Sequence, residues 1–223
     1  MQDKYTKYKI KSKHGILTLP RKELSFSSIS LWNTSQTQFR DKYYEGIKFG
    51  ENKYTLFGRE IHELIGRNKK FKDIQIGEQE KKIIVKLEGI PLVGYIDTFN
   101  KLFKRGEYAF GEYKTGKNEW TQTKADTNKQ VKSYSLLITL LTKRKANKAF
   151  IVWLETESTP DIKIGSVTLK HNTMRLTGHR KKYEIKINNL DRELIKQWII
   201  NSAIAISEDY QNYLKKLSTG MPF

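Results

Sequence analysis

The stretch Lys81–Thr115 reads KKIIVKLEGIPLVGYIDTFNKLFKRGEYAFGEYKT, and it decides the fold. Short runs rich in apolar residues lie on either side of two turn signals, Gly89-Ile90-Pro91 and Arg105-Gly106. Runs of this kind, separated by glycine and proline, are typical of antiparallel strands joined by tight turns. The stretch therefore predicts a β-meander. Its strands are expected at Lys81–Leu87, Leu92–Leu102 and Tyr108–Thr115.

Apolar residues at helical spacing flank this meander on both sides. Helices are expected at Ser28–Tyr44, Phe57–Arg67, Lys129–Leu141 and Asp191–Leu217. Further strands are expected at Gly15–Leu19, at Ala149–Glu155 and in a hairpin or two over 160–187, with turns near His171-Asn172 and Gly178. The core order α-β-β-β-α-β predicts an α/β fold with a mixed sheet flanked by helices. We expect one domain, 1–223, with a core at about 25–155 and an appended C-terminal hairpin and helix, 156–223.

The composition narrows the function classes. Of the 223 residues, 42 are Lys or Arg and 24 are Asp or Glu, a net charge of +18. Such an excess favours a polyanionic partner, nucleic acid or an anionic membrane surface, although a lysine-rich solvated surface gives the same count. The lack of cysteine excludes disulfides, thiolate nucleophiles and cysteine-ligated zinc or iron–sulfur clusters. No apolar run is long enough to cross a bilayer and no signal peptide is evident, so we expect a cytoplasmic protein without a membrane partner.

Three residues of the meander suggest chemistry. Strand alternation places Glu112 and Lys114 on one face and Tyr113 on the other. A short turn before this strand favours antiparallel pairing, which brings Asp97 beside Glu112. Two carboxylates on neighbouring strands form a hard oxygen site suited to Mg²⁺ or Mn²⁺. A lysine beside it can orient or deprotonate water and stabilise negative charge, as phosphodiester hydrolysis requires.

These residues and further motifs, in this order along the chain, resemble the PD-(D/E)XK nuclease superfamily and, within it, the RecB-like branch. The resemblance spans residues 25–134, about half of the chain. Its motifs are Ser25-Phe26-Ser27-Ser28-Ile29 followed by Trp32, Phe39-Arg40 and Tyr43-Tyr44; Gly58-Arg59-Glu60-Ile61-His62; Gly94-x-x-Asp97 with Glu112-Tyr113-Lys114-Thr115-Gly116; and Gln130-x-x-x-Tyr134.

The resemblance implies a restriction-endonuclease-like core and a Mg²⁺- or Mn²⁺-dependent DNA nuclease. Relatives in this branch act mostly on DNA ends or single strands, often as exonucleases in recombination and repair. We therefore expect an exonuclease that acts on DNA ends or single strands in recombination, repair or phage DNA processing. By resemblance, the catalytic residues are Asp97, Glu112 and Lys114. The metal ligands are His62, Asp97, Glu112 and the backbone carbonyl of Tyr113. Gln130 and Tyr134 hold the DNA backbone or support Lys114.

Two departures from the family pattern change what we expect. The chain lacks the four cysteines that bind an iron–sulfur cluster in some relatives. It also lacks an ATPase motif, so any motor must be a separate helicase or recombination protein. The implied setting is the cytoplasm of a prokaryote or of a phage-infected host cell.

Other interpretations stay open at this point. The chain could be a non-catalytic basic nucleic-acid-binding module on the same fold, or an assembly protein that binds polyanions. His62 could be a surface histidine, and Glu112 with Lys114 an ordinary surface pair. Trp32, Phe39 and Tyr43 fit packing better than base stacking. The block His179-Arg180-Lys181-Lys182 offers Arg180, Lys181 and Lys182 as DNA-binding candidates, although each could be a solvated cation.

Overall fold

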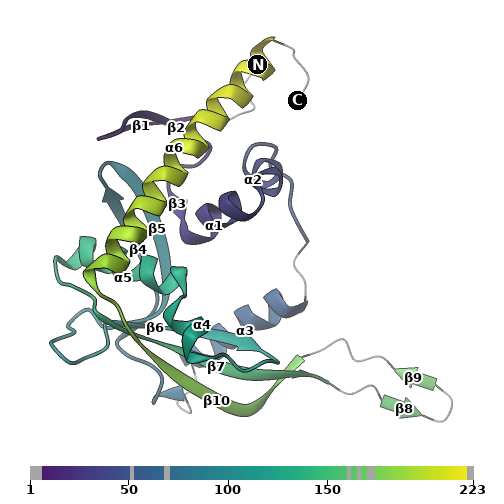
Figure 1. Cartoon of the computed structure of the whole chain (residues 1–223). Helices are drawn as coiled ribbons and strands as arrows, with labels where there is room; N and C mark the ends of the chain where they lie inside the picture. The colour runs from purple at the N-terminus through teal and green to yellow at the C-terminus, as the bar shows by residue number, and fades with distance from the viewer. Residues whose placement is uncertain are drawn as a thin grey trace.

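The predicted meander forms three adjacent strands on one side of a six-stranded mixed sheet in the computed structural model (Figure 1). The structure describes residues 7–50, 53–67, 71–159, 162–164, 167–169 and 174–219. The strands are β1 Tyr8–Ser12, β2 Gly15–Leu19, β3 Leu24–Ser25, β4 Glu78–Leu87, β5 Ile90–Phe99, β6 Phe110–Gly116, β7 Lys148–Ser158, β8 Ile162–Ile164, β9 Val167–Leu169 and β10 Met174–Lys186. The expected strand at Gly15–Leu19 is β2.

The main sheet runs β10-β7-β6-β5-β3, and β4 pairs with the other edge of β5. The pairs β10–β7, β4–β5 and β5–β6 are antiparallel, whereas β6–β7 and β3–β5 are parallel. A parallel pair requires a crossover connection, and α5 supplies it between β6 and β7. The predicted α/β class with a mixed sheet flanked by helices is confirmed.

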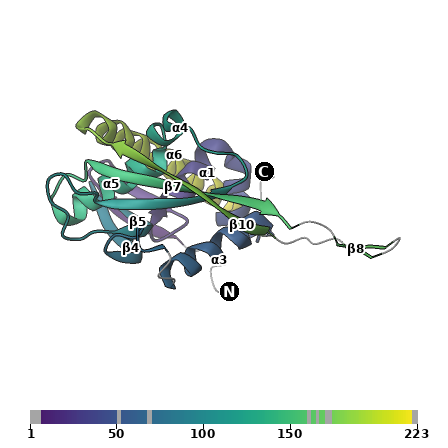
Figure 2. The same cartoon turned by 90° about the horizontal axis from the view of Figure 1, so that it is seen from below.

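Helices cover both faces of this sheet. The helices are α1 Phe26–Thr34, α2 Gln36–Tyr43, α3 Lys53–Arg67, α4 Gln122–Asp126, α5 Lys129–Thr142 and α6 Asn189–Thr219. One core joins α1, α5 and α6 to the sheet, and a smaller core joins α3 to β6 and β7. Figure 2 shows α3 and α5 on different sides of the strands, and Figure 1 shows α6 crossing the molecule diagonally. The sheet thus has an α5 face and an α3 face.

The single helix expected at Ser28–Tyr44 is wrong in one respect, because it breaks at Ser35. This residue is extended, with φ −156°, and it ends α1 and begins α2. Its hydroxyl accepts a hydrogen bond from the N–H of Gln38, so a serine that competes with the helical backbone stops one helix and caps the next. The aromatic residues here pack as expected: Trp32 and Phe39 are buried and meet edge to face.

The turn expected at Gly178 is also wrong. Gly178 has φ +94° but lies inside β10, where the register against β7 shifts between Leu176 and Arg180. A glycine in this left-handed conformation allows a β-bulge, so the strand continues instead of reversing. The turn expected at His171-Asn172 lies outside the described residues. Beyond the long β7–β10 ribbon, β8 and β9 pair as a small hairpin that projects from the body (Figures 1 and 2).

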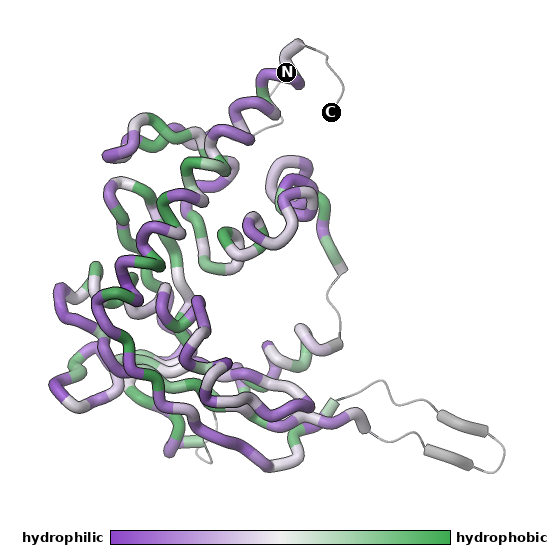
Figure 3. Tube along the Cα trace, in the orientation of Figure 1, coloured by the Kyte–Doolittle hydropathy of each residue, from purple (hydrophilic) through white to green (hydrophobic). Residues whose placement is uncertain are grey.

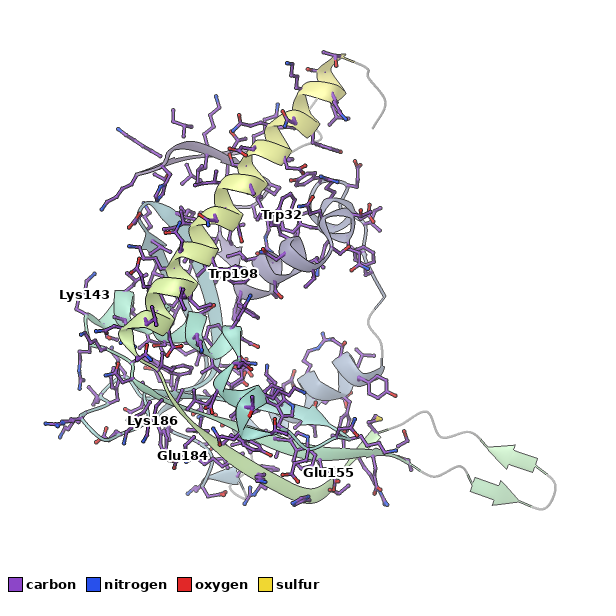
Figure 4. All side chains as sticks on the ribbon, in the orientation of Figure 1. Trp32, Lys143, Glu155, Glu184, Lys186 and Trp198 are labelled. Carbon is purple, nitrogen blue, oxygen red and sulfur yellow. The ribbon has the colours of Figure 1, made fainter. Side chains whose placement is uncertain are left out.

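The edge strand β10 differs in hydropathy from its inner neighbour β7. Figure 3 shows β10 as a mainly hydrophilic strand beside the more hydrophobic β7. In Figure 4, Trp198 on α6 and Trp32 on α1 lie on the inner side of their helices. The ring of Trp198 is 5.9 Å from that of Phe26, at the start of α1. Among the described residues, no helix combines the length and the apolar character needed to cross a membrane.

Candidate active site

Asp97 lies where strands β5 and β6 diverge. The two strands pair over the last two residues of β5 and the first two of β6. Continuing this register by one residue sets Asp97 opposite Glu112. The backbone N–H of Tyr113 donates to Asp97 Oδ2 at 2.6 Å, where the ladder with β5 has already ended. This hydrogen bond holds a buried carboxylate in the gap between the strands.

His62 approaches Asp97 from helix α3. Gly58 lies one helical turn before it, and a Cβ at that glycine would already touch Thr115 Oγ1 at 3.4 Å. The small residue therefore lets α3 lie close to the end of β6. His62 Nδ1 is 3.3 Å from Asp97 Oδ1. The imidazole also meets the Tyr113 ring edge to face, with the centroids 5.9 Å apart.

Glu80 is a third potential ligand, and the sequence analysis missed it. The β4–β5 register sets Glu80 opposite Asp97. Glu80 Oε1 lies 3.8 Å from His62 Nδ1, and one ligand atom from each of the three residues lies within 4.8 Å of the others. Glu80 lies as many residues before the turn at Glu88-Gly89 as Asp97 lies after it. The antiparallel hairpin in the sequence could therefore have predicted that Glu80 faces Asp97. We name His62, Glu80 and Asp97 the α3-side cluster.

The backbone at Glu80 has an unusual conformation. Its φ of +50° lies in the left-handed region, which costs a residue with a Cβ about 1 kcal/mol or more. The β4–β5 ladder is interrupted at this residue, between Gln79 and Lys81. Strained backbone often gathers at functional sites, where the surrounding structure holds it in place. Here it coincides with the carboxylate that meets His62.

A second group of polar side chains lies on the α5 face. Lys114 Nζ donates to Glu112 Oε1 at 2.7 Å and to Gln130 Oε1 at 2.8 Å. Gln130 Nε2 donates to Glu112 Oε1 at 2.6 Å and to Tyr134 Oη at 3.1 Å. The other carboxylate oxygen, Glu112 Oε2, is buried and has no hydrogen-bond partner in the described part of the chain. We name Glu112, Lys114, Gln130 and Tyr134 the α5-side network.

Gly94 allows helix α5 to reach this network. A Cβ at Gly94 would lie 2.9 Å from the Leu137 side chain and 3.2 Å from that of Tyr134. The first distance is shorter than a real Cβ contact, so with a larger residue at this position the Leu137 side chain or α5 itself would have to shift. The glycine of the Gly-x-x-Asp motif thus has a packing role, three residues before Asp97.

The pKa of Glu112 is strongly perturbed. Burial and then the negative charge of Asp97 raise its pKa to about 7, although Lys114 and His62 act against this. Burial disfavours a charged carboxylate, and a second carboxylate nearby disfavours it further. The positive charge of Lys114 therefore does not fully compensate the buried carboxylates of Glu112 and Asp97.

The same excess of negative charge shifts the pKa values of Lys114, His62 and Glu80. Burial alone lowers the pKa of Lys114, but its contacts with Glu112 outweigh this, and the net pKa is above the ordinary lysine value. Burial likewise lowers the pKa of His62, and Asp97 outweighs it, so the net pKa is raised. Burial and Asp97 also raise the pKa of Glu80. Lys114 is thus held as a cation, and the acids favour either protons or a bound cation.

Two cavities flank these residues. One of about 740 Å³ is lined by His62, Glu80 and Lys114, together with the first turns of α3. The other, of about 500 Å³, is lined by Gln130, Tyr134 and the start of α1. Lys114 lines the first cavity and Gln130 the second, and the hydrogen bond between these two side chains lies between the cavities.

Comparison with solved structures finds likenesses that include two exonucleases. A phage-related exonuclease from Haemophilus somnus 129PT aligns with a TM-score of 0.49 at 14% identity, covering 84% of this chain and 82% of that one. A candidate exonuclease from Eubacterium rectale aligns with a TM-score of 0.31 at 14% identity, covering 87% of this chain and 66% of that one. No family model and no curated protein matches the sequence.

The predicted ligand set is brought together in part. His62 and Asp97 are neighbours, and Asp97 lies within electrostatic reach of Glu112. The tightest cluster nevertheless contains Glu80, while Glu112 bonds to Lys114. The Tyr113 carbonyl as a ligand stays a prediction. Gln130 accepts a hydrogen bond from Lys114, and Tyr134 accepts one from Gln130; their expected roles, holding the DNA backbone or supporting Lys114, stay predictions.

The predicted DNA-binding block lies apart from this site, on β10 at the edge of the sheet. Arg180 is ion-paired with Asp73 at 3.0 Å and Lys181 with Glu119 at 2.5 Å. Lys182 Nζ lies 4.4 Å from the centroid of the Phe150 ring. Their contact with DNA stays a prediction, and two of these cations are already partly neutralised by acids.

Proposed function

We propose that this protein is a divalent-metal-dependent nuclease of the RecB-like branch of the PD-(D/E)XK superfamily. One observation carries the proposal: the buried Oε2 of Glu112 has no hydrogen-bond partner among the described residues and belongs to a carboxylate whose pKa is raised by burial and then by Asp97. A buried carboxylate oxygen without a partner costs considerable free energy unless a ligand completes it. A divalent cation would supply that partner.

The side chains present fit such an ion. Mg²⁺ and Mn²⁺ prefer carboxylate oxygen, and Mn²⁺ also accepts imidazole nitrogen. The α3-side cluster and Glu112 offer these donors, and the Tyr113 carbonyl would add another oxygen. When bound, the ion would polarise a phosphate oxygen and make water a better nucleophile.

Lys114 would act on the phosphate as a fixed positive charge. Its raised pKa keeps the amine protonated, and Glu112 with Gln130 fixes the Nζ position. A prepositioned cation stabilises charge that develops in the transition state without reorganising first. Gln130 is then a positioning residue, because it orients Lys114 and the bonded oxygen of Glu112.

We further propose that the substrate is DNA, cleaved from ends or as single strands, within one nuclease domain of residues 1–223. The net charge of +18 favours a polyanion. The family resemblance favours exonuclease action in recombination, repair or phage DNA processing, with any helicase or recombination partner on a separate chain. The same resemblance favours the cytoplasm of a prokaryote or of a phage-infected cell.

The decisive experiment compares labelled linear and circular DNA, single- and double-stranded, with Mg²⁺, Mn²⁺ or EDTA. We expect cleavage of linear DNA that needs the metal and is lost in Lys114→Ala. Lys117→Ala is the matched control, because Lys117 is an exposed lysine three residues further on. Cleavage of circular DNA would replace the exonuclease proposal by an endonuclease. Salt-sensitive binding without any metal-dependent cleavage would instead identify a non-catalytic binding module.

A further inference from the structure

Strand β4 ends the sheet on one side. It pairs with β5 along its length, and no other described strand pairs with its outer edge. An open edge presents unpaired backbone N–H and C=O groups to any extended chain that approaches. Proteins usually protect such edges with charge, bulges or covering elements.

The opposite edge, β10, shows that protection clearly. Its exposed residues are mostly charged, and Gly178 lies in a bulge. The side chain of Gln122, on α4, also donates to the backbone oxygen of Glu184. The β10 edge is therefore protected against pairing with another strand, whereas a groove lies along the β4 edge.

A groove of about 460 Å³ runs beside residues 81–84 of β4, between the loop after β5 and the end of α5. Its walls include three large apolar side chains that face solvent. Ile84 is 51% exposed, Leu102 is 76% exposed and Leu141 is 45% exposed. Single exposed apolar residues are common, but three that line one groove at a sheet edge favour a binding surface.

Positive charge surrounds this groove. Lys82, Lys101 and Arg144 line it, and none of them is ion-paired with another described residue. Further cations line the adjoining cavity of about 450 Å³, where the acid present is Glu107. These cations are Lys104, Arg105, Lys145 and Lys148. Figure 4 shows Lys143 at this same end of the molecule, away from the β8–β9 hairpin.

We propose that this groove, which we name the β4 edge groove, binds an extended acidic peptide segment of a partner protein. The segment would add as a strand to β4, place apolar side chains against Ile84, Leu102 and Leu141, and direct acidic side chains toward the surrounding cations. A DNA backbone fits less well, because phosphates gain nothing from three exposed aliphatic side chains. The proposal is independent of the nuclease function.

The test selects peptides without assuming their sequence. Random displayed peptides of about ten residues, the length of β4, are selected on the full-length protein in EDTA with excess duplex DNA as competitor. We expect enriched sequences that combine acidic residues with alternating large apolar ones. No enrichment, or enrichment without net negative charge, overturns the proposal.

Variants then locate the binding site of an enriched synthetic peptide by fluorescence anisotropy. Leu102→Asp should weaken binding by roughly tenfold or more, since it places a like charge among the peptide's acids. The matched control is Leu190→Asp, because Leu190 is 65% exposed on α6, and it should change affinity by less than about twofold. Thermal unfolding checks that both variants fold.

Two other outcomes would count against the β4 edge groove. Equal peptide binding by the wild type and Leu102→Asp would place the peptide elsewhere. A variant that keeps the peptide but loses affinity for duplex DNA would identify the groove as a nucleic-acid surface. N-methylation of alternate peptide amides should abolish binding, because strand addition depends on those N–H groups.

Discussion

The two halves of the candidate site differ in how they are held. In the α5-side network, Lys114, Gln130 and Glu112 Oε1 bond to one another at 2.6 to 2.8 Å. In the α3-side cluster, His62 Nδ1 lies 3.3 Å from one acid and 3.8 Å from the other. Lys114, Gln130 and Glu112 Oε1 are thus held by protein contacts, whereas His62 lies from its two acids at distances that a cation would close, and Glu112 Oε2 has no partner among the described residues. Under the proposed function, Lys114 and Gln130 would act on the transition state, and the acids with His62 would hold the metal, so the two roles can be tested by different variants.

The largest expected effect comes from removing the charge of the α5-side network. Lys114→Met keeps the length of the side chain and should lower single-turnover cleavage by roughly a thousandfold. Mn²⁺ affinity should change far less, because every proposed metal ligand, Glu112 included, is kept. Lys117→Met is the control. Activity within about tenfold of wild type would remove Lys114 from the chemistry.

The α3-side cluster should show the opposite pattern. Glu80→Gln and His62→Ala should each weaken Mn²⁺ binding by roughly ten- to a hundredfold in calorimetry, with activity restored at high Mn²⁺. Glu78→Gln is the matched control, since Glu78 is an exposed acid two residues earlier on the same strand. Unchanged affinity in Glu80→Gln would return the ligand set to His62, Asp97 and Glu112.

Gln130 tests whether positioning is separable from charge. Gln130→Leu removes the amide that holds Lys114 and Glu112, so we expect cleavage at saturating metal to fall by roughly tenfold. Tyr134→Phe removes only the hydroxyl that accepts from Gln130, so its effect should be smaller. A larger loss in Tyr134→Phe than in Gln130→Leu would contradict the proposed hierarchy.

The pH dependence of stability tests the buried acid without any substrate. The folded-state pKa of Glu112 is about 7, above its ordinary value, so its protonated form stabilises the fold. In EDTA, the melting temperature of the wild type should therefore fall relative to Glu112→Gln as the pH rises from about 5 to about 8, by several degrees. Saturating Mn²⁺ should remove this fall, because metal binding strengthens as protons leave. A parallel pH profile for both proteins would contradict the assigned pKa.

The smallest effect is expected on β10. Neutralising Arg180 or Lys181 removes a cation that an acid already balances, so DNA affinity should change by less than about threefold. The measurement is the salt dependence of binding to single-stranded DNA in EDTA. A steep loss in salt slope for either variant would restore the predicted role of this block.

The sequence predicted most of the elements that carry the site. The meander strands, α5 and α6 begin and end close to the expected residues, because strong apolar periodicity and glycine turns fix them. The break at Ser35 was missed, since a serine inside an amphipathic pattern reads equally as a helix residue or a cap. A turn was predicted at Gly178 because glycine is common in turns. Glycine also adopts the positive φ of a β-bulge, and the sequence does not distinguish the two.

The site itself was predicted less completely, because sequence motifs describe neighbours along the chain and not neighbours across strands. Motif spacing identifies residues one at a time, whereas Glu80 becomes visible only when β4 and β5 are laid side by side in register. Ion pairs of the β10 block depend on Asp73 and Glu119, which come from segments far away in the sequence. The sequence pattern of one strand therefore cannot predict ion-pair partners from other segments.

The left-handed residue Glu80 is followed directly by the part of β4 that lines the edge groove. A cation that fixes this residue therefore stiffens the same stretch of backbone that a docked chain must pair with. If metal binding raises the affinity for the peptide, thermodynamic reciprocity requires that peptide binding raises the affinity for the metal by the same factor. We expect this cooperativity to make partner recruitment depend on metal loading. Peptide titrations with and without Mn²⁺, repeated in Glu80→Gln, would measure it, and identical affinities would show two independent sites.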